Sequence, residues 1–192
     1  MSENPLPNRK SPRLKGYDYR LSGAYFVTIC SYQRGYLFGE VADSKMVLSR
    51  AGAIAQERWL DLPNHHSVGL DAFIVMPNHV HGIVILENDG GPRAANARVL
   101  PMESPQGVLE AQPAAGDVAR SSIAGSLSAV VGSYKSAVTR QLRRDLNMPA
   151  LKVWQNRYHD HIIRTRESFE KIQHYIWTNP GCWERDRYFS ED

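Results

Sequence analysis

The chain has 192 residues, of which 42% are hydrophobic and 22% charged, and its formal net charge is +3 at pH 7. This length and composition predict one domain with its own hydrophobic core. Two cysteines, Cys30 and Cys182, exclude a disulfide framework and a zinc-type cysteine cluster, so both are expected to be reduced thiols. No apolar run approaches the ~18 residues of a membrane span, and residues 1–23 lack the apolar core of a secretory signal. A cytoplasmic protein is expected.

Residues 1–23 are predicted to form a basic arm. They are polar and contain several prolines and glycines, which disfavour regular structure. Such a segment is either a disordered tail or an arm that contacts nucleic-acid phosphates. The candidate phosphate-binding residues of the arm are Arg9, Lys10, Arg13 and Lys15.

A single domain is predicted over residues 24–180, and its regular elements begin with a strand. The expected elements of the first half are strands at Ala24–Ser31, Val68–Met76 and His79–Leu86, an extension of the first strand over Gln33–Phe38, and a helix at Met46–Leu62. Ser44 is expected to cap that helix and Pro63 to end it.

The stretch Phe73–Leu86, FIVMPNHVHGIVIL, consists of two β-branched runs around a turn at Pro77-Asn78. His79 and His81 lie at positions i and i+2 of the second strand, so they share one face at a distance of roughly 7 Å. Two such histidines are more often exposed polar residues than metal ligands. This strand, however, is strongly apolar and therefore predicted to be central, and buried polar groups need a partner. A metal site at His79 and His81 follows as a hypothesis.

Residues 87–119 show no apolar periodicity and are predicted to be an insertion, unusually long for a connection within one domain. The elements expected after it are a helix at Ser126–Leu146, a strand at Val153–Ile163, a helix at Glu167–Asn179 and a polar tail over residues 181–192. The first of these helices carries the basic residues Lys135, Arg140 and Arg143, and the sequence from residue 120 to residue 144 contains no acidic residue. A helix face of one sign favours a nucleic-acid backbone as its partner.

The element order β-α-β-β-α-β-α predicts an α+β fold. The natural candidate is a ferredoxin-like (RRM-like) antiparallel sheet, with helices on one face and one further C-terminal helix. In that last helix Tyr175 and Asn179 lie one turn apart on one flank of the apolar stripe, and Lys171 lies one turn before Tyr175.

Four strings, MPNHVHGIVIL, YKSAVT, VWQNRYHDHII and IQHYIWTNP, occur in an order that resembles the single-tyrosine HUH transposases, and among them the REP-associated tyrosine transposases. The resemblance covers about residues 13–188. It implies a ferredoxin-like fold and the cleavage and joining of single-stranded DNA beside hairpins through a 5′-phosphotyrosine. It also implies repetitive extragenic palindromes as substrates and a monomer rather than a homodimer.

Residue by residue, the resemblance implies that His79 and His81 bind a divalent metal with Asn179 as third ligand, and that Tyr175 is the nucleophile. Two imidazoles and an amide oxygen suit Mg or Mn, and such an ion would polarise the scissile phosphate. A phenol with a pKa near 10 needs help to attack, and Lys171 is a candidate for stabilising the phenolate.

Two other classes stay open. A catalytically silent protein could keep the fold and bind DNA hairpins without cutting them. A metal-dependent hydrolase could use His79 and His81 in a zinc site with water as the nucleophile. A denaturant-resistant protein–DNA adduct is expected only of the transposase class.

Overall fold

The computed structural model describes residues 21–87 and 125–189. The predicted arm residues Arg9, Lys10, Arg13 and Lys15, and nearly all of the predicted 87–119 insertion, lie outside the described residues. Among the helices within the two described ranges, none has both the length and the apolar character that crossing a bilayer requires. Cys30 is buried and Cys182 is exposed, and neither forms a disulfide within the described residues.

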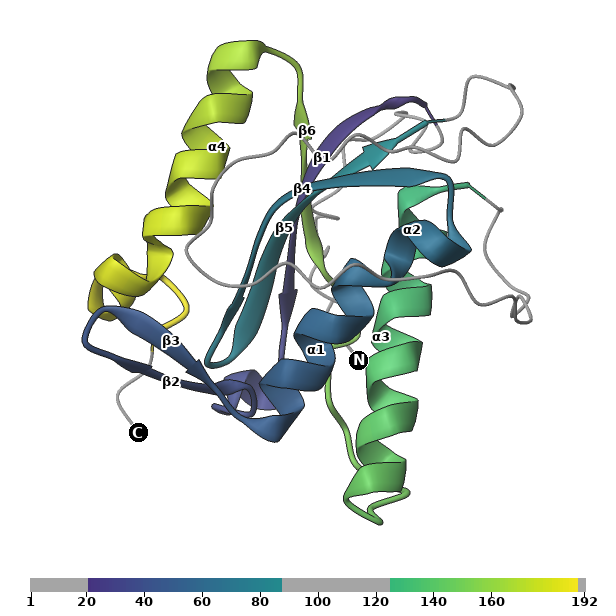
Figure 1. Cartoon of the computed structure of the whole chain (residues 1–192), viewed down its shortest axis with the longest axis vertical. Helices are drawn as coiled ribbons and strands as arrows, with labels where there is room; N and C mark the ends of the chain where they lie inside the picture. The colour runs from purple at the N-terminus through teal and green to yellow at the C-terminus, as the bar shows by residue number, and fades with distance from the viewer. Residues whose placement is uncertain (1–20, 88–124, 190–192) are drawn as a thin grey trace, which may run out of the picture.

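A four-stranded antiparallel sheet with strand order β4-β5-β1-β6 forms the centre of the fold (Figure 1). Its strands are β1 (Gly23–Cys30), β4 (Val68–Met76), β5 (His79–Leu86) and β6 (His159–Ile163). Helix α1 (Arg50–Leu60) lies between β1 and β4 in the chain, and α3 (Leu127–Asp145) lies between β5 and β6. This arrangement is ferredoxin-like, so the predicted fold class is confirmed.

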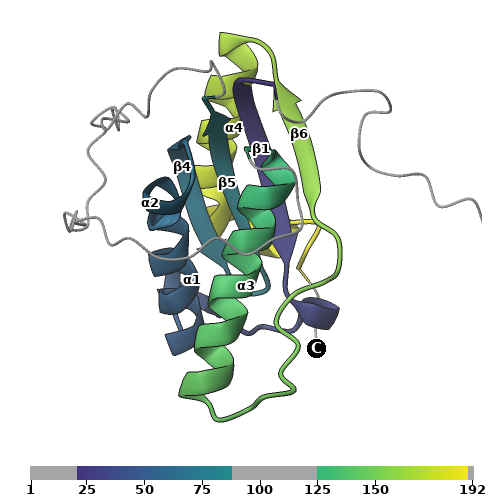
Figure 2. The same ribbon diagram turned by 90° about the vertical axis from the view of Figure 1, so that its right-hand side faces the viewer.

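Helices cover both faces of the sheet. α1 and α3 lie on one face, and α4 (Arg166–Thr178) lies on the other (Figure 1, Figure 2). Successive side chains of a strand point to opposite faces. In β5, Val80 and Val84 therefore join the core beneath α1 and α3, whereas Ile83 packs with Ile176 of α4. The C-terminal helix is thus separate from the other helices, as predicted.

The face beneath α1 and α3 is a close-packed apolar core centred on Trp59. The Trp59 ring stacks on Phe73 with 4.6 Å between centroids and meets Tyr134 edge-on at 5.3 Å. Gly82 of β5 lies directly under the indole, because a Cβ at this position would stand 2.2 Å from Cζ2 of Trp59. A glycine in the central strand therefore allows the indole to approach the backbone.

The structure corrects the prediction for residues 33–65. A hairpin of β2 (Gly39–Ala42) and β3 (Lys45–Leu48) occupies the start of the predicted Met46–Leu62 helix. The helix begins at Arg50, and its cap is Ser49, whose side chain accepts a hydrogen bond from the Gly52 N–H. The predicted cap Ser44 instead lies in the hairpin turn with φ 59°.

Two smaller corrections flank the hairpin and α1. The predicted strand extension at Gln33–Phe38 was wrong, because a short 3-10 helix, η1 (Tyr32–Arg34), follows β1. Pro63 does not end the helical region, since the short helix α2 (Leu62–His65) contains it near its first turn, where its missing N–H costs no hydrogen bond.

The second half follows its predicted boundaries more closely. Ser126 caps α3 by accepting a hydrogen bond from the Ala129 N–H, and Thr165 caps α4 in the same way. The predicted Val153–Ile163 strand is reduced to β6, and Trp154 makes only an isolated bridge with Ser31. After α4 the chain continues as the 3-10 helix η2 (Asn179–Arg185).

Candidate active site

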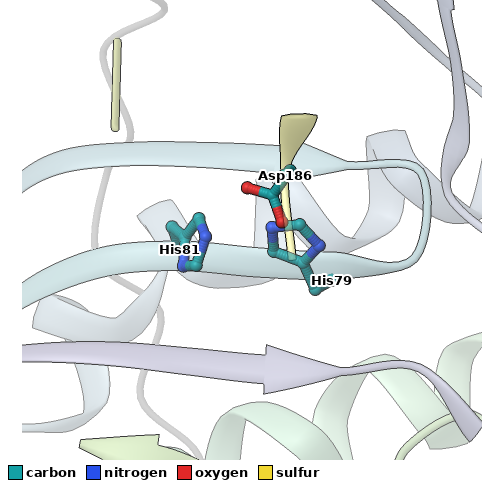
Figure 3. A group of neighbouring side chains, drawn as sticks. All are labelled: His79, His81 and Asp186. Carbon is teal, nitrogen blue, oxygen red and sulfur yellow. The ribbon is translucent and has the colours of Figure 1, made fainter. Parts of the chain in front are cut away.

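Three potential metal-ligating side chains meet on the α4 face of the sheet. His79 and His81 project from β5 and are 0% and 1% exposed. Asp186, which follows η2, points toward them (Figure 3). One ligand atom from each of the three lies within 4.8 Å of the others. The predicted convergence of His79 and His81 is therefore present, and Asp186 joins it.

The hydrogen bonds of Asn78 fix the tautomer of His79. The Asn78 amide Nδ2 donates to the Tyr188 backbone carbonyl at 2.7 Å, so the amide oxygen faces His79. This oxygen lies 2.9 Å from Nδ1 of His79, which must therefore carry the proton. The lone pair of His79 then lies on Nε2, which is buried and has no hydrogen-bond partner among the described residues. A buried, unpartnered imidazole lone pair is a suitable metal ligand.

His81 is held between the sheet and α4. Its Nδ1 lies 2.9 Å from the Thr28 hydroxyl of β1, and its Nε2 lies 3.2 Å from the Tyr175 hydroxyl. Burial lowers the pKa of His81 well below its usual value and lowers the pKa of His79 to about 4. Both imidazoles are therefore neutral at physiological pH, which is the form that binds metals.

Tyr175 of α4 places its hydroxyl at the same cluster. The hydroxyl donates to Oδ2 of Asp186 at 3.1 Å, and the ring meets Phe26 of β1 edge-on. Burial first, and then the negative charge of Asp186, raise the pKa of this phenol, so it is protonated at neutral pH. The residue is nevertheless 40% exposed, so a phosphodiester could reach it.

Asn179, the predicted third ligand, lies in contact with the cluster through Asp186. Its Nδ2 donates to Oδ2 of Asp186 at 2.8 Å, while its Oδ1 is buried with no hydrogen-bond partner in the described part of the chain. The amide nitrogen, which cannot bind a metal, therefore faces Asp186. Ligation by Asn179 stays a prediction, and Asp186 is the carboxylate that the sequence prediction missed.

Other predicted residues lie away from the cluster. Lys171 is exposed, and its ammonium group forms an ion pair with Glu167 at 2.6 Å. Glu167 lies one helical turn before Lys171, whereas Tyr175 lies one turn after it. In α3, which covers the other face, Lys135 donates to the Gln155 carbonyl and Arg143 to the Leu151 carbonyl. Lys135 and Arg143 bind the connection between α3 and β6, and Arg140 and Arg143 are both exposed.

The donor set fits a divalent cation. It offers two neutral imidazoles and one carboxylate, and one imidazole nitrogen, Nε2 of His79, is buried and lacks a hydrogen bond within the described residues. Buried polar atoms without partners are costly. A bound divalent ion would use the free lone pair that the fold leaves on His79.

Comparisons with known proteins place the chain beside one curated relative and several solved structures. No protein-family model matches it. The solved structures include a REP-associated tyrosine transposase bound to a REP hairpin, with 16% identity, coverage of 88% of this chain and 73% of that chain, and a TM-score of 0.48. A candidate transposase from Deinococcus radiodurans has 16% identity, coverage of 86% and 95%, and a TM-score of 0.43.

The curated relative is an uncharacterized protein of Haemophilus influenzae. It is 33% identical to this chain over 190 residues, which cover 96% of this chain and 94% of the relative. Identity at this level along nearly the whole of both chains shows common descent, and the chain belongs to the same family as this Haemophilus influenzae protein.

Proposed function

We propose that the chain is a single-tyrosine HUH transposase of the REP-associated type, which cuts and joins single-stranded DNA beside hairpins in a metal-dependent reaction. One observation carries the proposal. The Tyr175 hydroxyl lies 3.2 Å from Nε2 of His81 and 3.1 Å from Oδ2 of Asp186. A nucleophile and a metal-ligand cluster on different elements thus meet at one point, as attack on a metal-bound phosphate requires.

In the proposed reaction the Tyr175 oxygen attacks the scissile phosphorus. A bond forms between the phenol oxygen and phosphorus, the bond from phosphorus to the 3′-oxygen breaks, and the leaving 3′-oxygen takes up a proton from water to become a hydroxyl. Oδ2 of Asp186 already accepts the hydrogen bond of the phenol and is the base best placed to take its proton. A divalent ion held by His79, His81 and Asp186 would supply electrostatic stabilisation to the phosphate oxygens.

The reverse reaction uses the same groups. A 3′-hydroxyl attacks the phosphotyrosine and loses its proton to water, the bond from phosphorus to the phenol oxygen breaks, and the leaving phenolate takes back the proton held by Asp186. A phenolate is a better leaving group than an alkoxide because its pKa is lower, near 10 in water. Joining therefore needs no energy source beyond the covalent intermediate.

Within one copy of the chain, the Tyr175 hydroxyl lies within hydrogen-bond distance of both His81 and Asp186, which supports a site built by a single chain. We infer that a monomer supplies its own nucleophile. Mixing a Tyr175→Phe chain with a His81→Ala chain should then restore no cleavage. Restored cleavage would show that a tyrosine is exchanged between subunits.

The decisive experiment is the trapping of a covalent adduct. A labelled REP-type hairpin oligonucleotide is incubated with the protein and Mn²⁺, and the products are separated under denaturing conditions. The wild type should give a nick and a labelled protein band, and Tyr175→Phe should give neither while still binding the hairpin. Tyr32→Phe is the matched control, since Tyr32 is 39% exposed against 40% for Tyr175.

Peptide mass spectrometry of the adduct should place the nucleotide on Tyr175. Nicking without an adduct would instead support the metal-dependent hydrolase. Hairpin binding without nicking would support a catalytically silent binder. Full nicking by Tyr175→Phe would reject the mechanism.

A further inference from the structure

Two arginines from distant parts of the chain meet beside the metal-ligand cluster. The guanidinium carbons of Arg34 and Arg187 lie over the ring of Tyr188, at 5.3 Å and 4.6 Å from its centroid. That ring is itself 4.6 Å from the His79 ring and 5.9 Å from the His81 ring. The two cations thus lie one aromatic ring away from the histidines.

The positive charge of this pair is only partly offset by an acidic neighbour, Asp186. Within residues 21–87 and 125–189, neither guanidinium forms an ion pair with a carboxylate, although both side chains are exposed. Asp186 carries the cluster's single negative charge, and a divalent ion would add further positive charge. The local field favours an anion.

The backbone around Arg34 adopts a strained conformation. Gln33 and Arg34 have φ angles of 55° and 60°, in the left-handed region that non-glycine residues seldom adopt. The loop is fixed by two hydrogen bonds of Ser31: its N–H donates to the Asn78 carbonyl at 2.8 Å, and its hydroxyl to the Gly35 carbonyl at 2.8 Å. The loop that carries Arg34 is therefore tied directly to the turn that orients His79. Strained residues of this kind concentrate where geometry serves function.

We propose that Arg34 and Arg187 form a phosphate-binding pair that holds the backbone of single-stranded DNA against the His79, His81 and Asp186 cluster. Guanidinium groups match the oxygens of a phosphodiester in shape and charge better than any other side chain. Tyr188 supports both groups by stacking, and Arg187 also donates a hydrogen bond to its hydroxyl. The proposal rests on the proposed function for the identity of the anion. Its test does not require cleavage.

The test measures how DNA affinity depends on salt. A labelled single-stranded hairpin oligonucleotide is titrated with the wild type, with the double variant Arg34→Ala/Arg187→Ala, and with the control Arg164→Ala/Arg185→Ala. The control removes the same charge from two other exposed arginines. Each lost phosphate contact should reduce the slope of log affinity against log salt by about 0.7 to 0.9. A fall of about twice that amount is expected for the double variant only.

Binding of Mn²⁺ alone, followed by electron paramagnetic resonance, separates a direct role from a structural one. Removing two cations beside the site should leave Mn²⁺ affinity unchanged or raise it, because repulsion falls. A loss of Mn²⁺ binding would mean that the arginines only support the cluster, and would overturn the proposal. An equal salt slope for the double variant and its control would overturn it as well.

Cleavage is measured in parallel to keep the two proposals apart. If the wild type forms no adduct but the salt slope falls selectively, the phosphate pair stands and the proposed reaction fails. If adducts form but the double variant keeps the wild-type salt slope, the proposed reaction stands and the role of Arg34 and Arg187 in phosphate binding is rejected. Absence of any DNA binding by the wild type would reject both.

Discussion

The two faces of the sheet are built from the same strands, yet one buries apolar side chains and the other buries two histidines. Beneath α1 and α3, Trp59 packs on Phe73, Tyr134 and the bare backbone of Gly82. Beneath α4, the same strand β5 presents buried His79 and His81. The first face gains stability from apolar burial. The second face loses part of that stabilisation, because it buries two imidazoles, and Nε2 of His79 has no hydrogen-bond partner among the described residues.

Alternation along β5 makes this division possible. Val80 and Val84 point to the first face, while His79 and His81 point to the second. A shift of one residue in the register would exchange the two sets. Changes on the α1 and α3 face should therefore affect folding, and changes on the α4 face should affect chemistry with less effect on folding.

His81→Ala should produce the largest effect on activity. Loss of this ligand removes the stabilisation of charge at the phosphate, so the rate of adduct formation should fall by roughly 10³-fold. Hairpin binding should persist, because the groups expected to contact DNA are elsewhere. Rates are measured in Mn²⁺ by denaturing electrophoresis, with His65→Ala, an exposed histidine outside the cluster, as the control. Equal rates for the two variants would reject the metal site.

Trp59→Ala should produce the largest effect on stability. Removal of a fully buried indole should cost about 3–5 kcal/mol of unfolding free energy, measured by urea denaturation. Trp177→Ala is the control, since Trp177 is 46% exposed, and it should change stability by less than about 0.5 kcal/mol. Protein that remains folded at low temperature should form adducts at the wild-type rate. A specific loss of that rate would mean that the faces are not independent.

Asp186→Asn should decide which side chain completes the cluster. The substitution keeps the shape but removes the negative charge, so Mn²⁺ affinity should fall by about 10- to 100-fold or more. Asn179→Ala is the comparison, because it removes the hydrogen bond to Asp186 and tests ligation by the amide. If Asn179→Ala lowers Mn²⁺ affinity more than Asp186→Asn does, the third ligand is Asn179, as predicted from the sequence.

The smallest effects should come from a matched pair of glycines. Nothing lies within 4 Å of a Cβ placed on Gly132 of α3, so Gly132→Ala should stabilise the protein by about 1 kcal/mol. Gly82→Ala should have the opposite sign and cost about 1–3 kcal/mol, because its Cβ would meet Trp59. The melting temperatures of the two variants, compared with that of the wild type, test both predictions. A stabilised Gly82→Ala protein would show that the indole is less tightly packed than the structure indicates.

Elements with strong local signals were predictable from the sequence. β4 and β5 have the predicted boundaries, because two β-branched runs are separated by Pro77-Asn78. The boundaries of α3 follow from its apolar stripe and the Ser126 cap. The placement of His79, His81 and Tyr175 around one point followed from the resemblance, and the structure brings these three together.

The β2–β3 hairpin was missed because its turn lacks the usual marker. Asp43 and Ser44 adopt φ angles of 50° and 59°, yet no glycine is present to indicate them. Leu48 and Ala51 also continue into the helical spacing of α1, so the short strand was absorbed into the predicted helix. Where strand and helix periodicities overlap in this way, tertiary packing rather than local preference decides which element forms.

Asp186 could not be found from local pattern. It lies in a charged segment that resembles a solvated tail, and it reaches the cluster because Trp183 and Tyr188 on either side are buried. Those two residues and Phe189, which packs against Trp183, are the aromatic signal in the sequence that the segment packs against the domain. Arg34 and Arg187 were missed for the same reason, since their proximity depends on Tyr188.

The hydrogen bonds of Asn78 also make the site depend on the chemical integrity of one amide. Its nitrogen donates to the Tyr188 carbonyl while its oxygen accepts from His79. Spontaneous deamidation would replace the donor with a carboxylate oxygen, which would repel the Tyr188 carbonyl and release the segment that carries Asp186. Pairing of His79 with both Cys30 and Met76 restrains the backbone nitrogen that must attack the amide during this reaction. The working lifetime of the protein would then depend on a residue that touches no substrate.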